Sequence, residues 1–245
     1  MRIQDNKSTI ASNNHFDPKK TLHKHLSFAA TEQYKLLRTN LEFTIPAETK
    51  CPVIGVTSAM RGDGKSTTSI NLAYVLAEKG SKVLLIDGDL RLPSIAKKME
   101  IANSPGLTEV LMDKGISIDT FKSQVNENWW IMPAGEIPPN PSELLGSKRM
   151  ESVLNLYRQE FDYIIIDLPP ANIVSDALSI SSFVTGMVVV IRENKTEKRE
   201  LDRCVKQFQL SNIQILGFVI NGSREQSGSY KKYKHYSAYS QDGSK

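Results

Sequence analysis

Cysteine is scarce in this chain of 245 residues. Cys51 and Cys204 stand far apart, and neither belongs to a Cys-x-x-Cys pair or lies beside a histidine. This excludes a disulfide-stapled scaffold and a zinc ribbon, because both need clustered cysteines. Two isolated thiols are typical of a protein that works in a reducing compartment.

Long apolar runs are also missing. The longest candidates, residues 163–166 and 187–191, are far shorter than the roughly 18 to 20 residues that a membrane-spanning helix needs. The first residues hold no apolar stretch of the kind found in a signal peptide. We therefore expect a cytoplasmic protein, with any attachment to a membrane supplied by a partner.

A basic surplus is absent from the central part of the chain. Residues 1–26 and residues 222–245 each carry a net charge of +3, which leaves −2 for residues 27–221 out of a total of +4. A nucleic-acid-binding domain would carry its positive charge on the fold itself. We therefore expect no nucleic acid partner. The basic ends are either simply solvated or face an anionic membrane surface or an acidic partner.

The C-terminal residues 222–245 contain no Val, Ile, Leu, Met, Phe or Trp, so nothing there can join a core. The composition predicts a disordered tail, and the polar residues 1–26 predict a flexible basic arm. Half of the eight tyrosines lie in the tail: Tyr230, Tyr233, Tyr236 and Tyr239. A three-residue spacing drifts around a helix of 3.6 residues per turn, which disfavours a packed stripe and favours exposed tyrosines.

Between these ends, apolar strands alternate with amphipathic helices. This alternation predicts one α/β domain over residues 27–221, with a mostly parallel sheet and helices on both faces. Strands are expected at residues 53–58, 82–87, 129–133, 163–167, 187–191 and 214–220. Helices are expected at about residues 31–43, 65–79, 147–160 and around 201–208, with short helical stretches around 107–112 and 118–122. The prolines of residues 138–141 are expected to break the chain.

The first chemical motif is Ala59-Met60-Arg61-Gly62-Asp63-Gly64-Lys65-Ser66-Thr67. It fits the phosphate-loop pattern G-x-x-x-x-G-K-[ST], except that Ala59 replaces the first glycine. Gly62 and Gly64 let the backbone curl so that its N–H groups point at phosphate oxygens, and the following helix adds its positive N-terminus. A bland glycine-rich turn is the alternative, but the position between a strand and a helix favours a P-loop NTPase fold.

The motif also supplies charge. Lys65 would reach the β- and γ-phosphates of a nucleotide, and the hydroxyl of Ser66 would bind Mg²⁺. Asn221, at the end of the last predicted strand, is a candidate for contact with the adenine. The predicted nucleotide-binding residues are Arg61, Gly62, Asp63, Gly64, Lys65, Ser66, Thr67 and Asn221.

Carboxylates follow two of the apolar strands. Asp87 and Asp89 stand just past one strand, with Arg91 beside them, and Asp167 ends another. The carboxyl ends of parallel strands line the ligand crevice, and a carboxylate there needs a cation or a hydrogen-bond donor. Mg²⁺ held by phosphates is one such cation. The alternative for any single one of these aspartates is the N-cap of a helix.

Several segments resemble those of the bacterial tyrosine kinases, the P-loop kinases of capsule and exopolysaccharide synthesis. The segment Asp87–Arg91 resembles their second Walker motif, D-x-D-x-R, and Ile137–Leu145 (IPPNPSELL) resembles another stretch of the family. Residues Glu32–Asn40 resemble its N-terminal oligomerisation helix, E-x-x-R-x-x-R, and the tail resembles its tyrosine cluster. The resemblance covers about residues 32–239.

This resemblance implies a tyrosine autokinase that uses Mg·ATP and phosphorylates its own tail tyrosines. It implies that Lys65 stabilises the transferring phosphoryl group and that Asp87 orients or deprotonates the tyrosine hydroxyl. Asp89 and Arg91 complete the implied catalytic set. The implied metal-binding residues are Ser66, Asp87, Asp89 and Asp167. Lysines at positions 231, 232 and 234 of the tail are expected to steer it towards the acidic Asp87 and Asp89.

The resemblance further implies partners. A ring-shaped homo-oligomer is expected through Glu32, Lys35 and Arg38, although Lys35 replaces the middle arginine and loses its planar fork. The split form of the family implies a separate membrane-anchored activator of the polysaccharide co-polymerase type, which would hold the chain at the inner face of the cell membrane. A cognate tyrosine phosphatase is also expected.

Two other classes remain open. A positioning ATPase of the MinD/ParA kind shares the fold, but those proteins carry an extra lysine at the second position of the phosphate loop, where this chain has Met60. They include a type with an amphipathic C-terminal membrane helix, which the tyrosine tail replaces here. A nucleotide-gated scaffold without kinase activity would differ only in whether phosphate leaves ATP.

Overall fold

The computed structural model describes residues 26–223. Its centre is one sheet of six parallel strands in the order β3-β2-β4-β1-β5-β6. The strands are β1 (Val53–Ser58), β2 (Val83–Asp87), β3 (Trp129–Met132), β4 (Tyr163–Asp167), β5 (Gly186–Arg192) and β6 (Ile215–Asn221). The sequence-based prediction of a parallel α/β fold is confirmed.

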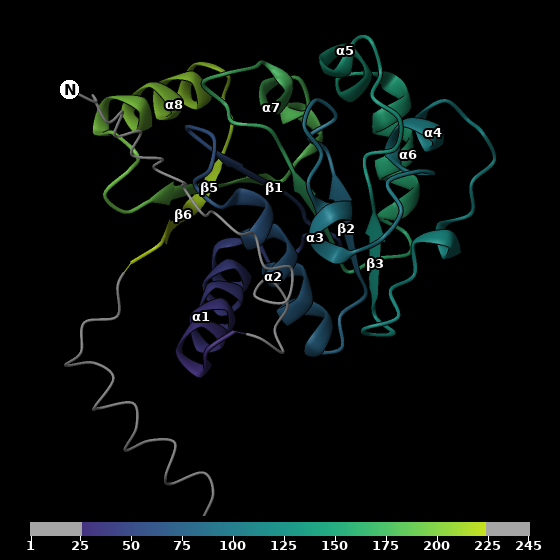
Figure 1. Ribbon diagram of the computed structural model, residues 1–245, viewed down its shortest axis with the longest axis horizontal. Helices are drawn as coiled ribbons and strands as arrows, with labels where there is room; N and C mark the ends of the chain where they lie inside the picture. Colours follow the sequence, from purple (N-terminus) through teal and green to yellow (C-terminus); the bar gives the residue numbers. More distant parts are fainter. Residues whose placement is uncertain (1–25, 224–245) are drawn as a thin grey trace, which may run out of the picture.

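Helices cover both faces of this sheet (Figure 1). They are α1 (Phe28–Thr44), α2 (Lys65–Glu78), α3 (Ile95–Met99), α4 (Leu107–Leu111), α5 (Pro141–Leu145), α6 (Lys148–Tyr157), α7 (Asp176–Ser179) and α8 (Lys198–Leu210). Two 3₁₀ turns, η3 (Ile118–Phe121) and η4 (Ser181–Phe183), complete the described elements. Helices α1 and α2 pack on one face, and α4, α5, α6 and α8 pack on the other.

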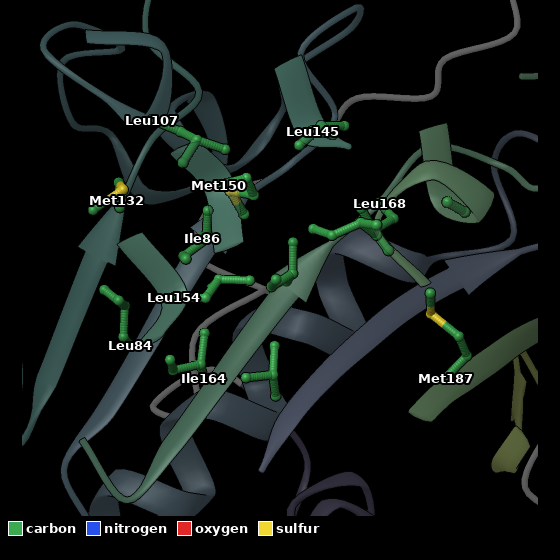
Figure 2. Packing of buried hydrophobic residues seen from close by; sticks show 14 of the residues in the cluster. Leu84, Ile86, Leu107, Met132, Leu145, Met150, Leu154, Ile164, Leu168 and Met187 are labelled. Carbon is green, nitrogen blue, oxygen red and sulfur yellow. The ribbon is translucent and has the colours of Figure 1, made fainter. Parts of the chain in front are cut away.

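The core therefore has two halves, one on each side of the sheet. Alternate residues of each strand point to opposite faces, so Ile54 of β1 joins one half and Val53 joins the other. Figure 2 shows the half beneath α4, α5 and α6, where Leu84 and Ile164 of the sheet lie close to Leu154 of α6. Strands buried on both faces explain the continuous apolar runs in the sequence.

Helix α1 extends the predicted helix at both ends. The hydroxyl of Ser27 accepts a hydrogen bond from the N–H of Ala30 and caps its start. Leu41 is buried, and Tyr34 and Leu37 pack against the same half of the core, as the helical spacing predicts. Helix α1 thereby lies along α2, the helix that follows the phosphate loop (Figure 1).

Three short helices were not predicted: α3, α5 and α7. The proline-rich segment was expected only to break the chain, yet Pro141 occupies the first turn of α5. Proline is well tolerated there because its fixed φ suits the helix and its missing N–H would have no partner. All three helices follow carboxyl ends of strands, so they shape the edge of the sheet where the predicted site residues lie.

No helix within residues 26–223 is long and apolar enough to cross a lipid bilayer.

Candidate active site

The phosphate loop connects β1 to α2. Gly62 and Gly64 adopt φ values of +82° and +102°, a left-handed conformation that residues with a Cβ rarely adopt. A Cβ added at Gly64 would also overlap the side-chain amide of Asn221. Both glycines are therefore required by the backbone path, and the loop opens its N–H groups at the start of α2.

Side chains from the end of β5, the turn after it and the end of β6 hold this loop from one side, which we call the clamp side: Arg192, Lys195 and Asn221. Nη1 of Arg192 donates to the carbonyl of Gly62 at 3.0 Å, and Nζ of Lys195 donates to that of Arg61 at 3.1 Å. Nδ2 of Asn221 donates to the carbonyl of Asp63 at 2.9 Å. Asn221, predicted to contact adenine, thus lies against the loop and also lines the cavity described below.

Arg192 and Lys195 were not predicted from the sequence. One signal was available, because Arg192 directly follows the apolar run of β5, just as Asp167 ends the apolar run of β4. Asp63, in contrast, was predicted to bind nucleotide and is fully buried. Its carboxylate accepts the N–H of Met60, and burial raises its pKa. Asp63 therefore stabilises the loop from behind.

The opposite side of the loop, which we call the acidic side, consists of the segments after β2 and β4. There Nζ of Lys65 lies 2.9 Å from Oδ2 of Asp89 and 3.4 Å from Oδ2 of Asp167. Burial alone would lower the pKa of Lys65, but the charges of Asp167 and Asp89 outweigh it and raise the pKa. Lys65 is thus held as a cation between two strand ends.

Asp167 is fully buried at the end of β4. Its Oδ1 accepts a hydrogen bond from the hydroxyl of Ser69 on α2 at 3.1 Å. Burial raises the pKa of Asp167, and the nearby Lys65 opposes that shift. Ser66, one turn earlier on α2, lines the cavity. The sheet and α2 therefore bring Lys65, Ser66, Asp89 and Asp167 together, as the sequence predicted for their positions.

Asp87 plays a different part. Its Oδ1 accepts the N–H of Asp89, and its Oδ2 accepts the N–H groups of Ser94 and Ile95 at 3.0 and 2.9 Å. Ile95 begins α3 and Ser94 is its N-cap residue, so Asp87 is not the N-cap itself but accepts N–H groups at the start of this helix from the end of β2. Burial and the charge of Asp167 raise the pKa of Asp87 to about 7. Asp87 is fully buried and is not among the described residues that line the cavity.

Arg91 makes a paired contact that the sequence did not predict. Its Nε and Nη2 donate to the two carboxylate oxygens of Asp176 at 2.9 and 3.1 Å. Nη2 also donates to the hydroxyl of Ser142 at 3.0 Å, and this hydroxyl donates to Asp176 at 2.6 Å. Ser142 belongs to the Ile137–Leu145 segment, whose place in the fold is thereby explained: it supports Arg91.

Between the clamp side and the acidic side lies a cavity of about 360 Å³ that is open to solvent. Phosphate-loop residues form its floor, and Lys98 of α3 reaches the hydroxyl of Thr67 at 3.3 Å. Burial lowers the pKa of Lys98. The cavity is lined by Arg61, Gly62, Gly64, Lys65, Ser66, Thr67, Asp89, Arg91, Leu92, Ser94, Lys98, Pro169, Pro170, Ile173, Val174, Arg192 and Asn221.

The charges in this lining are mostly positive. Five cationic side chains line the cavity and only one carboxylate does, that of Asp89, which is already paired with Lys65. Asp87 lies out of reach behind its loop. The cavity therefore attracts a polyanion such as a nucleotide. Such a lining does not favour a basic tail, so it lends no support to the expected steering of the tail lysines towards Asp87 and Asp89, which stays a prediction.

The residues present suit a Mg²⁺-nucleotide complex. The left-handed glycines and the start of α2 form a cradle for phosphate. The hydroxyl of Ser66 and the carboxylates of Asp89 and Asp167 are hard oxygen donors, which Mg²⁺ prefers. Within residues 26–223, no cluster of three or more His, Cys, Asp or Glu forms a metal site by itself. Mg²⁺ usually binds to proteins through one or two carboxylates together with phosphates.

The predicted oligomerisation residues lie on α1. Lys35 pairs with Glu32 at 3.0 Å on the helix surface. Nη1 of Arg38 donates to the carbonyl of Val75 on α2. Arg38 is therefore used within its own chain, while Glu32 and Lys35 face outward. The predicted phosphorylation sites, the four tail tyrosines, lie outside the described residues.

The fold and this site define a P-loop nucleotide-binding protein whose loop has Ala59 in place of the first glycine. The family described as ParA, NUBPL iron-transfer P-loop NTPase, matches residues 50–245. At the level of individual relatives, the chain is 36% identical to the tyrosine-protein kinase YwqD of Bacillus subtilis, over 88% of this chain and 87% of that protein. It is 33% identical to the putative tyrosine-protein kinase CapB of Staphylococcus aureus, over 84% and 87% of the two chains.

Solved structures agree with these relatives. The chimerical protein CapA2B2 superimposes with a TM-score of 0.76 at 30% identity, covering 84% of this chain and 89% of that one. The kinase domain of the Escherichia coli tyrosine kinase ETK superimposes with a TM-score of 0.75 at 30% identity, covering 81% and 77%. The chain belongs to the family of bacterial tyrosine-protein kinases, within the ParA group of P-loop NTPases.

The positioning ATPases resemble the chain less closely. The MinC:MinD complex of Aquifex aeolicus superimposes with a TM-score of 0.58 at 24% identity, covering 74% of this chain and 72% of that one. A likeness at this level shows a shared fold alone. Met60, which stands where those ATPases carry a lysine, is partly exposed at the phosphate loop. The kinase interpretation is therefore better supported than the MinD/ParA alternative.

Proposed function

We propose that this protein is a Mg·ATP-dependent tyrosine autokinase that phosphorylates Tyr230, Tyr233, Tyr236 and Tyr239 of its own tail and thereby regulates the synthesis and export of capsular or extracellular polysaccharide. One observation carries the proposal: in a chain of the tyrosine kinase family, Lys65 is held between Asp89 and Asp167 at the start of α2. This arrangement presents a cation and the carboxylate of Asp89 where a γ-phosphate would meet an acceptor, with the buried carboxylate of Asp167 behind Lys65.

The reaction exchanges one bond at phosphorus. The tyrosine oxygen forms a bond to the γ-phosphorus, the bond from this phosphorus to the β–γ bridging oxygen breaks, and ADP leaves with that electron pair. The phenolic proton passes to a carboxylate or to water. Lys65 stabilises the charge on the transferring group, and positioning supplies much of the remaining rate enhancement.

The metal and the base follow from the same contacts. Ser66 and Asp89 line the cavity and would hold Mg²⁺, and the buried Asp167 would hold it through water. When bound, the metal neutralises charge on the phosphates. We assign the acceptor hydroxyl to Asp89 rather than to Asp87, because Asp89 lines the cavity and Asp87 is buried beneath three N–H donors. Asp87 then acts as a positioning residue that shapes the loop carrying Asp89 and Arg91.

The test mixes two variants, neither of which can phosphorylate its own tail. One is the Lys65→Met variant with its tail intact, and the other is an active chain whose four tail tyrosines are changed to phenylalanine. We expect ATP-dependent phosphotyrosine on the Lys65→Met protein, detected by mass spectrometry. A wild-type chain that hydrolyses ATP without forming phosphotyrosine under any condition would refute the kinase assignment and favour an ATPase of the MinD/ParA kind. A chain that binds ATP and releases no phosphate from it would instead favour a nucleotide-gated scaffold.

We further propose that the chain forms a homo-oligomeric ring through α1. The outer surface of this helix carries Phe28, Leu36 and Phe43, which are 59%, 52% and 85% exposed, beside the outward-facing Glu32 and Lys35. Large exposed apolar side chains on one helix suit a contact with another copy. We expect Phe43→Ser to lower the assembled mass by light scattering, whereas Leu210→Ser on α8, equally exposed at 85%, leaves it unchanged.

The proposed location and partners follow from the family. A membrane-anchored activator of the polysaccharide co-polymerase type would hold the protein at the inner face of the membrane, and a cognate phosphatase would reverse the modification. We expect weak autophosphorylation by the isolated chain and stimulation by the cytoplasmic segment of the activator. Full activity that no such segment changes would argue against this arrangement.

A further inference from the structure

Two apolar side chains stand open on the acidic side of the cavity. Leu92 is 54% exposed and Ile173 is 41% exposed, and both line the cavity. They come from the segments after β2 and β4, which pair directly in the sheet. Apolar side chains that stay open to water inside a cavity are suited to the apolar part of a ligand. The nucleotide phosphates offer no such part.

Beside them lies a cation in a fixed position. The contacts of Arg91 with Asp176 and Ser142 occupy Nε and Nη2 of its guanidinium group. Asp176 is fully buried, so the carboxylate that pairs with Arg91 is itself surrounded by packed atoms. A guanidinium group carries five N–H donors, so in the described residues the donors of Nη1 are left for a ligand in the cavity. Arginine held in this way is well suited to bind phosphate.

We propose that Arg91, Leu92 and Ile173 form a subsite for an aryl phosphate. Leu92 and Ile173 contact the ring and Arg91 binds the phosphoryl group. Asp176 and Ser142 are the positioning residues of this subsite. The inference deepens the proposed function and rests on it for the source of the ligand: a tail tyrosine during transfer, and its phosphotyrosine afterwards.

The order of the strands separates this subsite from the nucleotide. The phosphate loop follows β1, which lies between β4 on the acidic side and β5 on the clamp side. Arg192 and Asn221 line the cavity at the clamp side, where the base is expected, and Leu92 and Ile173 line it at the other. Two reactants can therefore approach the phosphate loop from opposite directions. An in-line transfer between them requires this arrangement.

Direct binding tests the subsite without any transfer. The full chain is saturated with Mg·ADP and titrated with phenyl phosphate, then with inorganic phosphate, by calorimetry. We expect phenyl phosphate to bind roughly tenfold more tightly, since its ring gains apolar contact. Leu92→Ser and Ile173→Ser should each remove most of this preference while inorganic phosphate binds as before. Neither change touches the bond from the N–H of Leu92 to Asp89.

The chain offers matched controls. Leu156 is 53% exposed and Ile101 is 41% exposed, and neither is among the described residues that line the cavity. Leu156→Ser and Ile101→Ser should keep the preference for phenyl phosphate. Equal binding of the two ligands by the wild type, or an equal loss in the controls, would overturn the subsite.

The positioning residues give a second readout. Ser142→Ala removes one contact to Arg91, and Asp176→Asn weakens the pairing of charges. Both should weaken phenyl phosphate and inorganic phosphate by the same factor, roughly threefold to tenfold for one charge-assisted hydrogen bond. If Asp176→Asn does not fold, Ser142→Ala decides the point. Unchanged binding of both ligands to Ser142→Ala would exclude this positioning role.

Failure of the subsite and failure of the proposed function are distinguishable. If phenyl phosphate binds as expected but no phosphotyrosine forms, the subsite stands and the kinase assignment fails. If the tail is phosphorylated and Leu92→Ser and Ile173→Ser leave its KM unchanged, the kinase assignment stands and the subsite is wrong. A raised KM at an unchanged kcat in these variants, absent from Leu156→Ser and Ile101→Ser, supports both.

Discussion

The two sides of the cavity hold the same phosphate loop by different physical means. On the acidic side, Lys65 contacts Asp89 and Asp167, whose side chains are 7% and 0% exposed. On the clamp side, Arg192 and Lys195 reach over the loop from an exposed surface and donate to its backbone carbonyls. The acidic side therefore fixes charged side chains, and the clamp side fixes the course of the backbone.

This difference sets the scale of each contribution. A buried charge that loses its partner is costly, because neither water nor a counter-ion replaces the lost contact. An exposed hydrogen bond to a carbonyl exchanges readily with water, so its net contribution is about 1 kcal/mol or less. We therefore expect changes on the acidic side to be severe and changes on the clamp side to be graded.

The largest effect is expected for Lys65→Met. Loss of a lysine that touches both carboxylates should reduce phosphoryl transfer roughly 10²- to 10³-fold, the usual consequence of removing one stabilising group. It also leaves Asp89 and Asp167 buried without their cation, so the free energy of unfolding should fall by about 3–5 kcal/mol. Autophosphorylation rates and urea denaturation at neutral pH measure the two effects.

The matched control for this change is Lys195→Met. Lys195 also contacts the phosphate loop, but its Nζ donates to the carbonyl of Arg61 at the exposed surface. It should retain nearly all of the transfer rate and the stability. If the two lysine variants lose activity to the same extent, the distinction between the two sides of the cavity is wrong.

Asp87→Asn tests the buried end of the acidic side through its pH dependence. Folding raises the pKa of Asp87 from 3.8 to about 7. The stability associated with its protonated form is therefore fully present below pH 3.8 and is lost as the pH rises through about 7. An asparagine lacks this loss, but its amide cannot accept all three N–H groups.

The variant should therefore be less stable than the wild type by about 1–3 kcal/mol near pH 5, and the difference should shrink by pH 8. Denaturation at the two pH values measures it. Asp113→Asn is the control, because Asp113 forms an exposed ion pair with Arg149 and should give a small difference at both. A difference for Asp87→Asn that does not change with pH would show that its carboxylate is ionised throughout this range.

The acidic side was the more predictable of the two from sequence. Its carboxylates directly follow apolar runs, and parallel strands bring their carboxyl ends to one edge, so the position of Asp89 and Asp167 near Lys65 could be predicted. The fold followed from the same alternation of strands and helices. What each carboxylate contacts was not predictable, because Asp87 is separated from Asp89 by one residue and yet faces the backbone of α3 instead of the cavity.

The clamp side was largely missed, and the reason is physical. Arg192 and Lys195 contact backbone carbonyls more than a hundred residues away, and a carbonyl is the same in every residue, so no residue type marks the contact. Asp176 was missed for a related reason: its partner Arg91 is brought close only by the pairing of β2 with β4. Such contacts depend on the packed fold rather than on local spacing.

A smaller effect is expected for Asn221→Ala on the clamp side. It removes the hydrogen bond from Nδ2 to the carbonyl of Asp63, worth about 1 kcal/mol, so the affinity for Mg·ATP should fall roughly fivefold. Calorimetry with Mg·ATP on the Asn221→Ala variant and the wild type, both with Lys65 unchanged, measures this affinity. The same change makes room for a Cβ at Gly64, so Gly64→Ala should cost less affinity in the Asn221→Ala background than alone.

Comparing Gly64→Ala alone with the double variant separates two reasons why position 64 needs glycine. The overlap with Asn221 disappears in the double variant, whereas the strain of φ at +102° persists. Equal costs of Gly64→Ala in the two backgrounds would mean that strain alone requires the glycine.

The smallest effect is expected for Arg192→Gln. Its Nη1 lies 3.0 Å from the carbonyl of Gly62 at an exposed position, and its charge lines the cavity. The variant loses both the hydrogen bond to Gly62 and the positive charge at the cavity. At low ionic strength the affinity for the nucleotide should therefore fall roughly threefold. Raising the salt concentration to about 1 M shortens the screening length to about 3 Å, so most of the charge contribution should vanish and the difference from wild type should approach twofold or less.

The losses of transfer rate and stability in Lys65→Met should persist at that salt concentration, because buried charges are screened much less. If salt reduces both effects equally, Lys65 is as open to solvent as Arg192, and the two sides of the cavity do not differ in the way that their burial indicates.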